Sequence, residues 1–130
     1  MSNQKKLQLI LEKEGSELWG RVSVNDNLII DTASTLKSLE KKIKSALKEF
    51  EGIEDPEFNY VYDLTVFFEQ FNFLNQSKMA ELAGINPGLI RQYSSGIKHP
   101  SKEQVEKIER AIKELSKRLA SVQLSSKAYA

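Results

Sequence analysis

The polar residues best suited to read a nucleic acid lie close together in the chain, between residues 76 and 98. Arg and Gln side chains can make paired hydrogen bonds to base edges, whereas Ser, Gln and Lys side chains can contact phosphate oxygens. We expect Gly88, Arg91 and Gln92 to face the bases. The expected phosphate contacts are Gln76, Ser95 and Lys98. Double-stranded DNA is therefore the first expected partner.

Two short helices joined by a tight turn are predicted to position these side chains. Gly84 stands where the chain must leave the first helix, in a left-handed conformation that favours glycine. Asn86 can cap the second helix, and Pro87 suits its first position. The apolar residues that would pack between the two helices are Met79, Ala80, Ala83, Ile85, Ile90 and Tyr93. The pattern predicts a helix-turn-helix with residues 87–95 as its recognition helix. The alternative is a helical hairpin that binds no nucleic acid.

This region resembles the Xre/Cro class of helix-turn-helix repressors. The matching residues are Gln76, Ala80, Gly84-Ile85, Asn86-Pro87, Gly96, Lys98 and Pro100-Ser101. Ser94 departs from the pattern, because the class often has Glu there. The resemblance implies a DNA-binding domain in the second half of the chain.

The first half of the chain has the periodicity of a small sheet with one helix. Alternating apolar and polar residues predict strands over 6–13, 18–24 and 58–62, with a short strand at 28–30. Apolar residues at three- and four-residue steps predict a helix over 35–51; they are Leu36, Leu39, Ile43, Ala46, Leu47 and Phe50. Thr35 or Ser34 would cap this helix and Gly52 would end it.

We therefore predict an α+β fold. The predicted parts are a β-β-β-α-β sheet domain over 1–62, an all-α helix-turn-helix domain over 63–124 and a disordered tail over 125–130. A helix over 63–71, with four apolar residues on one stripe, would support the helix-turn-helix.

Charge is divided unequally between the two halves. Residues 1–75 hold nine Lys/Arg and thirteen Asp/Glu, whereas residues 76–130 hold ten Lys/Arg and five Asp/Glu. Seven of the acidic residues lie between Glu49 and Glu69, a segment without Lys or Arg. An acidic half joined to a basic half suggests two different partners. The alternative for the acidic run is a solvated surface with no partner.

The predicted element order is similar to that of the HicB family of antitoxins. The residues that carry this resemblance are Leu7–Glu12, Leu18-Trp19-Gly20 and Thr35-Leu36-Lys37-Ser38-Leu39, together with the helix-turn-helix. The Gly-Tyr and Pro-rich segment that the family has between strands two and three is replaced by the short turn at residues 25–27. The resemblance implies a truncated RNase H-like first domain. It also implies an antitoxin that neutralises a small ribonuclease toxin by direct contact and represses its own operon.

A ribonuclease toxin must attract RNA, so we expect it to be basic and to meet the acidic run together with an edge of the sheet. The candidate toxin-binding residues are Glu51, Glu54, Asp55 and Glu57. A second reading, from another class, is a stand-alone transcription regulator whose first domain oligomerises or senses a ligand. A neighbouring reading frame for a small, basic, His-containing protein would favour the antitoxin.

No residue set in the sequence suits catalysis. RNase H chemistry requires converging carboxylates that hold two Mg²⁺ ions, and the predicted strands offer only Glu12 and Glu17 near their ends. The chain has one histidine, His99, no cysteine and no phosphate-binding glycine motif. We expect no enzymatic activity, no metal, no cofactor and no membrane span. A cytoplasmic location fits the lack of cysteine and of a signal peptide.

The last predicted helix begins with a capping box, Ser101 and Gln104, and runs to about Val122. It is longer than one small domain needs, so its far end offers a dimer seam. The candidate dimer residues are Leu115, Leu119, Val122 and Leu124. We expect a homodimer or a larger oligomer; the alternative seam is a strand edge in the first domain.

Overall fold

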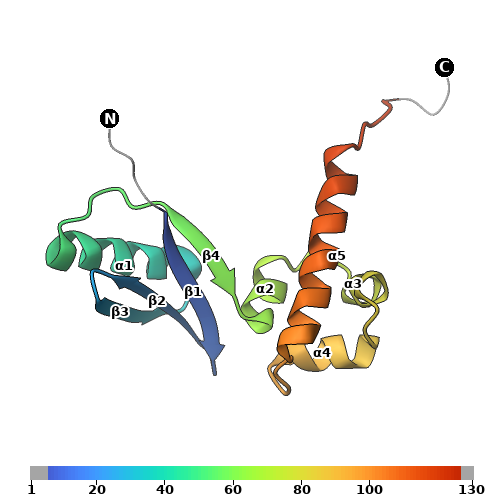
Figure 1. The fold of residues 1–130 in the computed structure, drawn as a ribbon, viewed down its shortest axis with the longest axis horizontal. Helices are drawn as coiled ribbons and strands as arrows, with labels where there is room; N and C mark the ends of the chain where they lie inside the picture. The colour runs from blue at the N-terminus through green and yellow to red at the C-terminus, as the bar shows by residue number, and fades with distance from the viewer. Residues whose placement is uncertain (1–5, 127–130) are drawn as a thin grey trace. The chain divides into compact units, whose positions relative to one another are not determined.

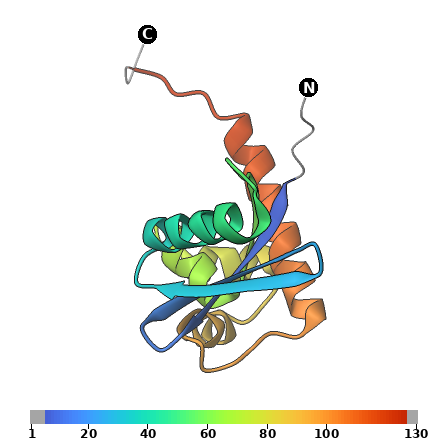
Figure 2. The ribbon, with the colours of Figure 1, turned by 90° about the vertical axis from the view of Figure 1, so that its left-hand side faces the viewer.

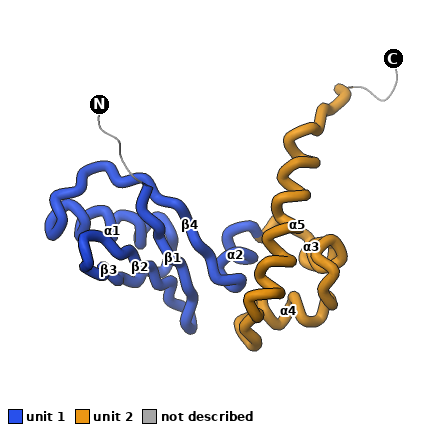
Figure 3. Tube along the Cα trace, viewed as in Figure 1, with its two compact units in different colours: residues 1–71 blue, residues 72–130 orange. Residues whose placement is uncertain are grey.

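A computed structural model describes residues 6–126 of the chain. It is a mixed α/β structure in which the described residues form one four-stranded sheet and five helices, the last of them long. The chain divides into two compact units, residues 1–71 and residues 72–130 (Figure 3). Each unit has its own packing.

The first unit contains the sheet (Figure 1). Its elements in chain order are β1 (Leu7–Glu14), β2 (Glu17–Val24), β3 (Asn27–Ala33), α1 (Leu36–Glu51), β4 (Phe58–Tyr62) and α2 (Leu64–Gln70). The strand order across the sheet is β3-β2-β1-β4, with β4 parallel to β1 and the other pairs antiparallel. The order of strands and helix along the chain is the predicted one. The third strand is longer than expected.

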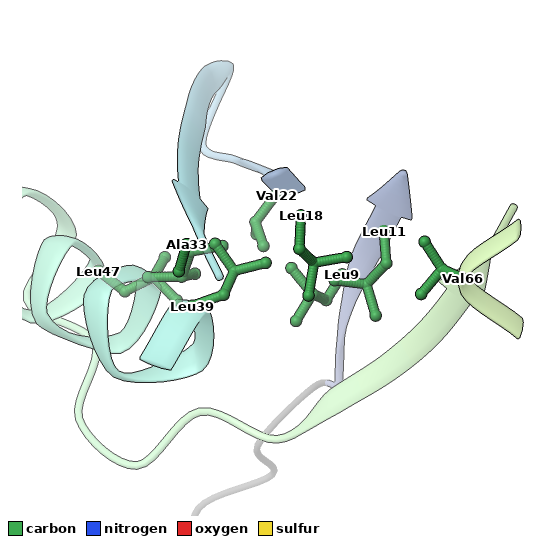
Figure 4. Packing of buried hydrophobic residues seen from close by; sticks show 9 residues of the cluster. Leu9, Leu11, Leu18, Val22, Ala33, Leu39, Leu47 and Val66 are labelled. Carbon is green, nitrogen blue, oxygen red and sulfur yellow. The ribbon is translucent and has the colours of Figure 1, made fainter. Parts of the chain in front are cut away.

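The period-two alternation buries one face of the sheet. Leu9, Leu11 and Val22 are fully or almost fully buried on one face of the sheet. Trp19, whose side chain lies on the opposite face, is 40% exposed. α1 lies across the buried face, as Figure 2 shows from the side. Figure 4 shows the side chains that meet there. The buried cluster consists of Leu9, Leu11, Leu18, Val22, Ala33, Leu39, Ile43, Leu47 and Val66.

Phe50 does not belong to this core, contrary to the sequence prediction. Its side chain is 70% exposed, although Leu39, Ile43 and Leu47 on the same helix are fully buried. Phe50 lies in the last turn of α1, before the Gly52 cap, and contributes to the lining of a groove beside β3. The helical period alone could not show where the sheet beneath the helix ends.

The turn between β2 and β3 fixes their register. Asn25 and Asp26 both have positive φ, 50° and 62°, which is the geometry of a two-residue type I′ hairpin turn. The pairing runs without interruption from Val24↔Asn27 to Leu18↔Ala33. Glu51 stabilises the turn, because its carboxylate accepts hydrogen bonds from the Asn25 and Asn27 amides at 3.0 and 2.9 Å.

The unit boundary places α2 with the sheet and not with the helix-turn-helix, so the predicted boundary after residue 62 is too early. Asp63 caps α2 by accepting from the Val66 N–H at 2.8 Å, and it also accepts from the Lys13 N–H at 3.1 Å. Val66 then packs into the sheet core, and Phe67 contacts Tyr62 with ring centroids 6.3 Å apart. The contacts of Asp63 with Lys13 and of Val66 with the sheet core join residues far apart in the chain, and they decide to which unit the helix belongs.

The second unit is helical in its described part: α3 (Gln76–Ala83), α4 (Pro87–Ser95) and α5 (Lys102–Ala120). Its buried side chains come from all three helices and the turn: Met79, Ala80, Ile85, Ile90, Tyr93, Ile108 and Ala111. The expected small residue, Ala80, is fully buried. No helix within residues 6–126 has both the length and the apolar character needed to cross a lipid bilayer.

α5 is shorter than predicted. It has 19 residues, or about 28 Å, and ends at Ala120 with Ser121 as its C-cap. Val122 and Leu124 therefore lie beyond the helix, and the predicted four-residue helical stripe is wrong. Half of the capping box is present, because Ser101 accepts from the Gln104 N–H, but the Gln104 Oε1 atom is buried without a partner. Of the predicted tail, residues 127–130 lie outside the described residues.

Gly20 allows α1 to approach the sheet closely. A Cβ atom at this position would lie 2.9 Å from both Leu39 Cδ2 and Ile43 Cδ1. Both of these side chains are fully buried, so they have little room to move. The fourth position of β2 is consequently best occupied by a residue without a side chain.

Gly20→Ala should lower the free energy of unfolding by about 1–3 kcal/mol, because it overpacks the contact with α1. Ser23→Ala on the exposed face of the same strand is the matched control, expected within about 0.5 kcal/mol of wild type. Urea denaturation followed by circular dichroism measures both. Equal stability of the two variants would show that α1 can shift away from the sheet at no cost.

Candidate nucleic-acid interface

Local capping signals position α3 and α4. Asn75 accepts from the Lys78 N–H at 3.0 Å, and Gly84 ends α3 with φ 72°. Asn86 begins α4 by accepting from the Gly88 N–H at 2.7 Å, and Pro87 follows at the first helical position. The roles of Gly84, Asn86 and Pro87 were predicted from the sequence, whereas the Asn75 cap was not. Together these features define two short helices joined by a tight turn.

Burial of two α4 residues orients the helix. Ile90 is fully buried and Tyr93 is 5% exposed, so the opposite side of α4 faces outward. Arg91 lies on the outward side, as expected, and Gln92 is half-buried. An exposed guanidinium can reach a base pair without losing a hydrogen bond inside the protein. The geometry therefore suits readout by Arg91 more directly than by Gln92.

The first turn of α4 brings three of the named residues together. A Cβ atom added to Gly88 would lie 3.1 Å from Asn86 Oδ1 and 3.8 Å from an Arg91 terminal nitrogen. The Arg91 side chain thus lies over the backbone of Gly88. In helix-turn-helix proteins, the N-terminal residues of the recognition helix contact base edges. This end of α4 is also the positive end of its helix dipole, which attracts phosphate.

Gln76 has a structural contact that the sequence did not reveal. Its side-chain amide donates to the Ser94 hydroxyl at 2.9 Å, which links the first residue of α3 to the end of α4. The two residues are 18 positions apart, so no periodic or capping signal predicts the pair. Ser94 is the position at which the sequence departs from the Xre/Cro pattern. The contact fixes Gln76 beside α4.

Ser95 and Lys98 lie at the other end of α4. The Ser95 hydroxyl donates to the Gln92 carbonyl at 3.2 Å, and the Lys98 N–H donates to the same carbonyl at 3.2 Å. The loop after α4 therefore folds back onto the helix and keeps Lys98 near Gln92. Lys98 and His99 are both exposed. The six predicted DNA-binding residues thus all lie on or next to α4, although not all of them are free.

The acidic residues predicted to bind a toxin do not form one uniform surface. Glu51 is half-buried and bonded to Asn25 and Asn27, so it has a structural role. Glu54 pairs with Lys48 at 3.7 Å. Lys44 and Lys48 of α1 line the same groove as Glu54 and Asp55, which offsets the local negative charge. The run is acidic in the sequence, but the fold places cations beside it.

Tyr60 shows one perturbed proton equilibrium in the first unit. Burial, followed by its hydrogen bond to the Glu40 carboxylate, raises the pKa of Tyr60 to about 12. The Tyr60 hydroxyl donates this hydrogen bond, and burial also raises the pKa of the neighbouring Tyr62. Within residues 6–126, no group of three or more His, Cys, Asp or Glu side chains is arranged to hold a metal ion.

No protein-family model matches the chain, and neither the curated proteins nor the solved structures contain a match to it.

Removal of the amide in Gln76→Ala should lower the free energy of unfolding by about 0.5–1.5 kcal/mol, because the bond to Ser94 is lost. Ser77→Ala, at the exposed neighbouring position, is the control and should change stability little. Chemical denaturation measures both variants. A Gln76→Ala protein as stable as the control would mean that the bond to Ser94 adds nothing net.

Proposed function

We propose that this protein is a HicB-like antitoxin that binds operator DNA through α4 and a small basic ribonuclease toxin through its first unit. The observation that supports DNA binding best is the outward placement of Arg91 over Gly88 at the N-terminal end of α4. Ile90 and Tyr93 fix that orientation by burial. In this role the protein catalyses no reaction. It acts in the cytoplasm.

Charge supports the division of roles. Residues 76–130 have a balance of +5, since ten Lys/Arg oppose five Asp/Glu, and residues 1–75 have a balance of −4. A basic unit gains affinity for DNA from counterion release, and an acidic unit is attracted to a basic partner. Non-specific binding by one such unit is weak, with a dissociation constant of about 10⁻⁴–10⁻⁶ M at physiological salt. Operator binding therefore requires two copies on half-sites about 34 Å apart.

A second function is consistent with the same DNA-binding unit. In a stand-alone regulator, the sheet unit would pair copies or sense a ligand and would bind no toxin. The discriminating observation is co-purification with the product of an adjacent gene. Failure of the wild-type chain to capture that product would favour the regulator.

Replacement of the readout residue in Arg91→Ala should weaken binding to the DNA upstream of the protein's own gene by about 1–3 kcal/mol and should relax sequence preference. Lys98→Ala should weaken binding to all duplexes alike, because a phosphate contact carries no sequence information. Arg110→Ala, an exposed change on α5, is the control for loss of charge. Gel shifts on upstream and scrambled duplexes compare the three variants.

A sequence preference unchanged in Arg91→Ala would remove this residue from base readout. A loss of equal size in Arg91→Ala and Arg110→Ala would assign the effect to net charge alone.

Neutralising the acidic loop should slow association with the toxin and flatten its salt dependence, with DNA binding retained. The variant is Glu54→Gln, Asp55→Asn and Glu57→Gln; Glu51 is left in place because it holds the β2–β3 turn. The control changes three α5 carboxylates by the same charge: Glu103→Gln, Glu106→Gln and Glu109→Gln. Surface-binding kinetics at several salt concentrations compare the two. Identical association rates would move the toxin surface away from this loop.

A further inference from the structure

β3 is an edge strand with a defined set of outward-facing backbone groups. In a two-residue hairpin, the residues that flank the turn, here Val24 and Asn27, exchange hydrogen bonds with each other. Alternate residues along β3 then turn their N–H and C=O groups toward β2. The residues between them, Leu28, Ile30 and Thr32, turn theirs outward. The strand order confirms that no fifth strand of the described chain covers this edge.

Thr32 supports this assignment and marks the end of the open edge. Its N–H donates to the Asp31 carboxylate at 2.8 Å, and its C=O accepts from the Lys42 ammonium at 2.8 Å. Both of its outward groups are thus satisfied by side chains. The open part of the edge consists of the N–H and C=O groups of Leu28 and Ile30.

This part of the edge lacks the features that normally prevent pairing. Proteins protect edge strands with Lys, Pro or a bulge. The strand sequence, NLIIDTA, contains neither Lys nor Pro, and its register with β2 has no bulge. Leu28 and Ile30 are 56% and 50% exposed. Beside them a groove of about 600 Å³ continues to Phe50.

We propose that a second copy of this chain pairs with β3 in antiparallel orientation, about a twofold axis at Ile29. Leu28 then faces Ile30 of the second copy, and Ile30 faces its Leu28. The two pairs exchange four backbone hydrogen bonds and extend the sheet across the dimer. The same register places Asn27 opposite Asp31 of the second copy, so the one carboxylate of the strand faces a neutral side chain.

The neighbouring twofold registers fit less well. A register centred on Ile30 places Leu28 opposite Thr32, whose outward groups are already bonded to Asp31 and Lys42. A register centred on Asp31 places two carboxylates opposite each other, which destabilises a strand pair. Only the register centred on Ile29 sets both open residues, Leu28 and Ile30, opposite open residues of the second copy. This self-complementarity favours a second copy over an unrelated extended segment.

The first test removes one outward donor from each copy. Ile30→Pro deletes the Ile30 N–H, which faces away from β2, so the internal ladder is retained. Ile30→Thr keeps that donor and a β-branched side chain. Leu115→Glu with Leu119→Glu disrupts the α5 surface, the alternative seam. Light scattering over a range of concentrations gives the mass of each full-length protein without DNA or toxin, so this result is independent of the proposed function.

We expect a dimer for wild type, for Ile30→Thr and for the α5 double variant. Ile30→Pro should raise the dissociation constant at least about tenfold, because two of the four hydrogen bonds are lost. A wild-type monomer, a dimer unaffected by Ile30→Pro, or a dimer lost only in the α5 variant would overturn the proposal. So would equal losses in Ile30→Pro and Ile30→Thr, since side-chain packing and not strand pairing would then hold the copies together.

A charge exchange tests the register, and it also serves if Ile30→Pro fails to fold. One chain carries Leu28→Lys and Ile30→Lys, and the other carries Leu28→Glu and Ile30→Glu. Each chain alone should be monomeric, because like charges face each other across the pair. A mixture of the two should form the heterodimer. A mixture that stays monomeric would rule out the pairing. If an unrelated segment occupied the edge instead, mixing the two charged variants would not produce a dimer.

Discussion

Gly20 leaves the space in which α1 lies against the sheet, and the rest of the first unit depends on that contact. Because Leu39 and Ile43 reach the strand backbone there, the helix covers one face of β2 and its neighbours. Hydrophobic burial is then confined to that face, where Leu9, Leu11 and Val22 are almost inaccessible. The other face and the β3 edge remain open to solvent or to a partner.

The second unit is held in place by local caps and by a small apolar core. α3 and α4 are short, so caps and a small buried core must fix them. Asn75 and Gly84 define where α3 begins and ends, and Asn86 defines where α4 begins. Burial of Ile90 and Tyr93 then decides which side of α4 is free. The polar surface of α4 is a consequence of apolar packing beneath it.

The surface charge of the first unit differs from what the sequence count suggests. The charge difference between the halves is real, yet Lys44 and Lys48 lie beside Glu54 and Asp55 in the folded chain. Glu51, which counts as an acid in the sequence, is used by the β2–β3 turn. The number of acidic residues in the run is therefore larger than the net negative charge of the surface that the run forms. The exposed acidic residues of the loop after α1 are Glu54, Asp55 and Glu57, and Glu54 is paired with Lys48.

The sequence by itself determined which elements form and where several helices begin. Period-two alternation predicted the strands, helical spacing predicted α1, and single residues such as Thr35, Asn86 and Ser101 predicted the caps. The outward position of Arg91 also followed from helical spacing. These features depend on residues a few positions apart, and their geometry is fixed by the backbone and by short hydrogen bonds.

Only the tertiary structure decided which surfaces meet. It placed β4 beside β1, which left β3 at an edge, and it joined α2 to the sheet through Val66. It also exposed Phe50, ended α5 before Val122 and bonded Gln76 to Ser94. Each of these outcomes depends on contacts between residues far apart in the chain. Local periodicity carries no information about such contacts, because the same apolar side chain can be buried or exposed according to what the rest of the fold brings against it.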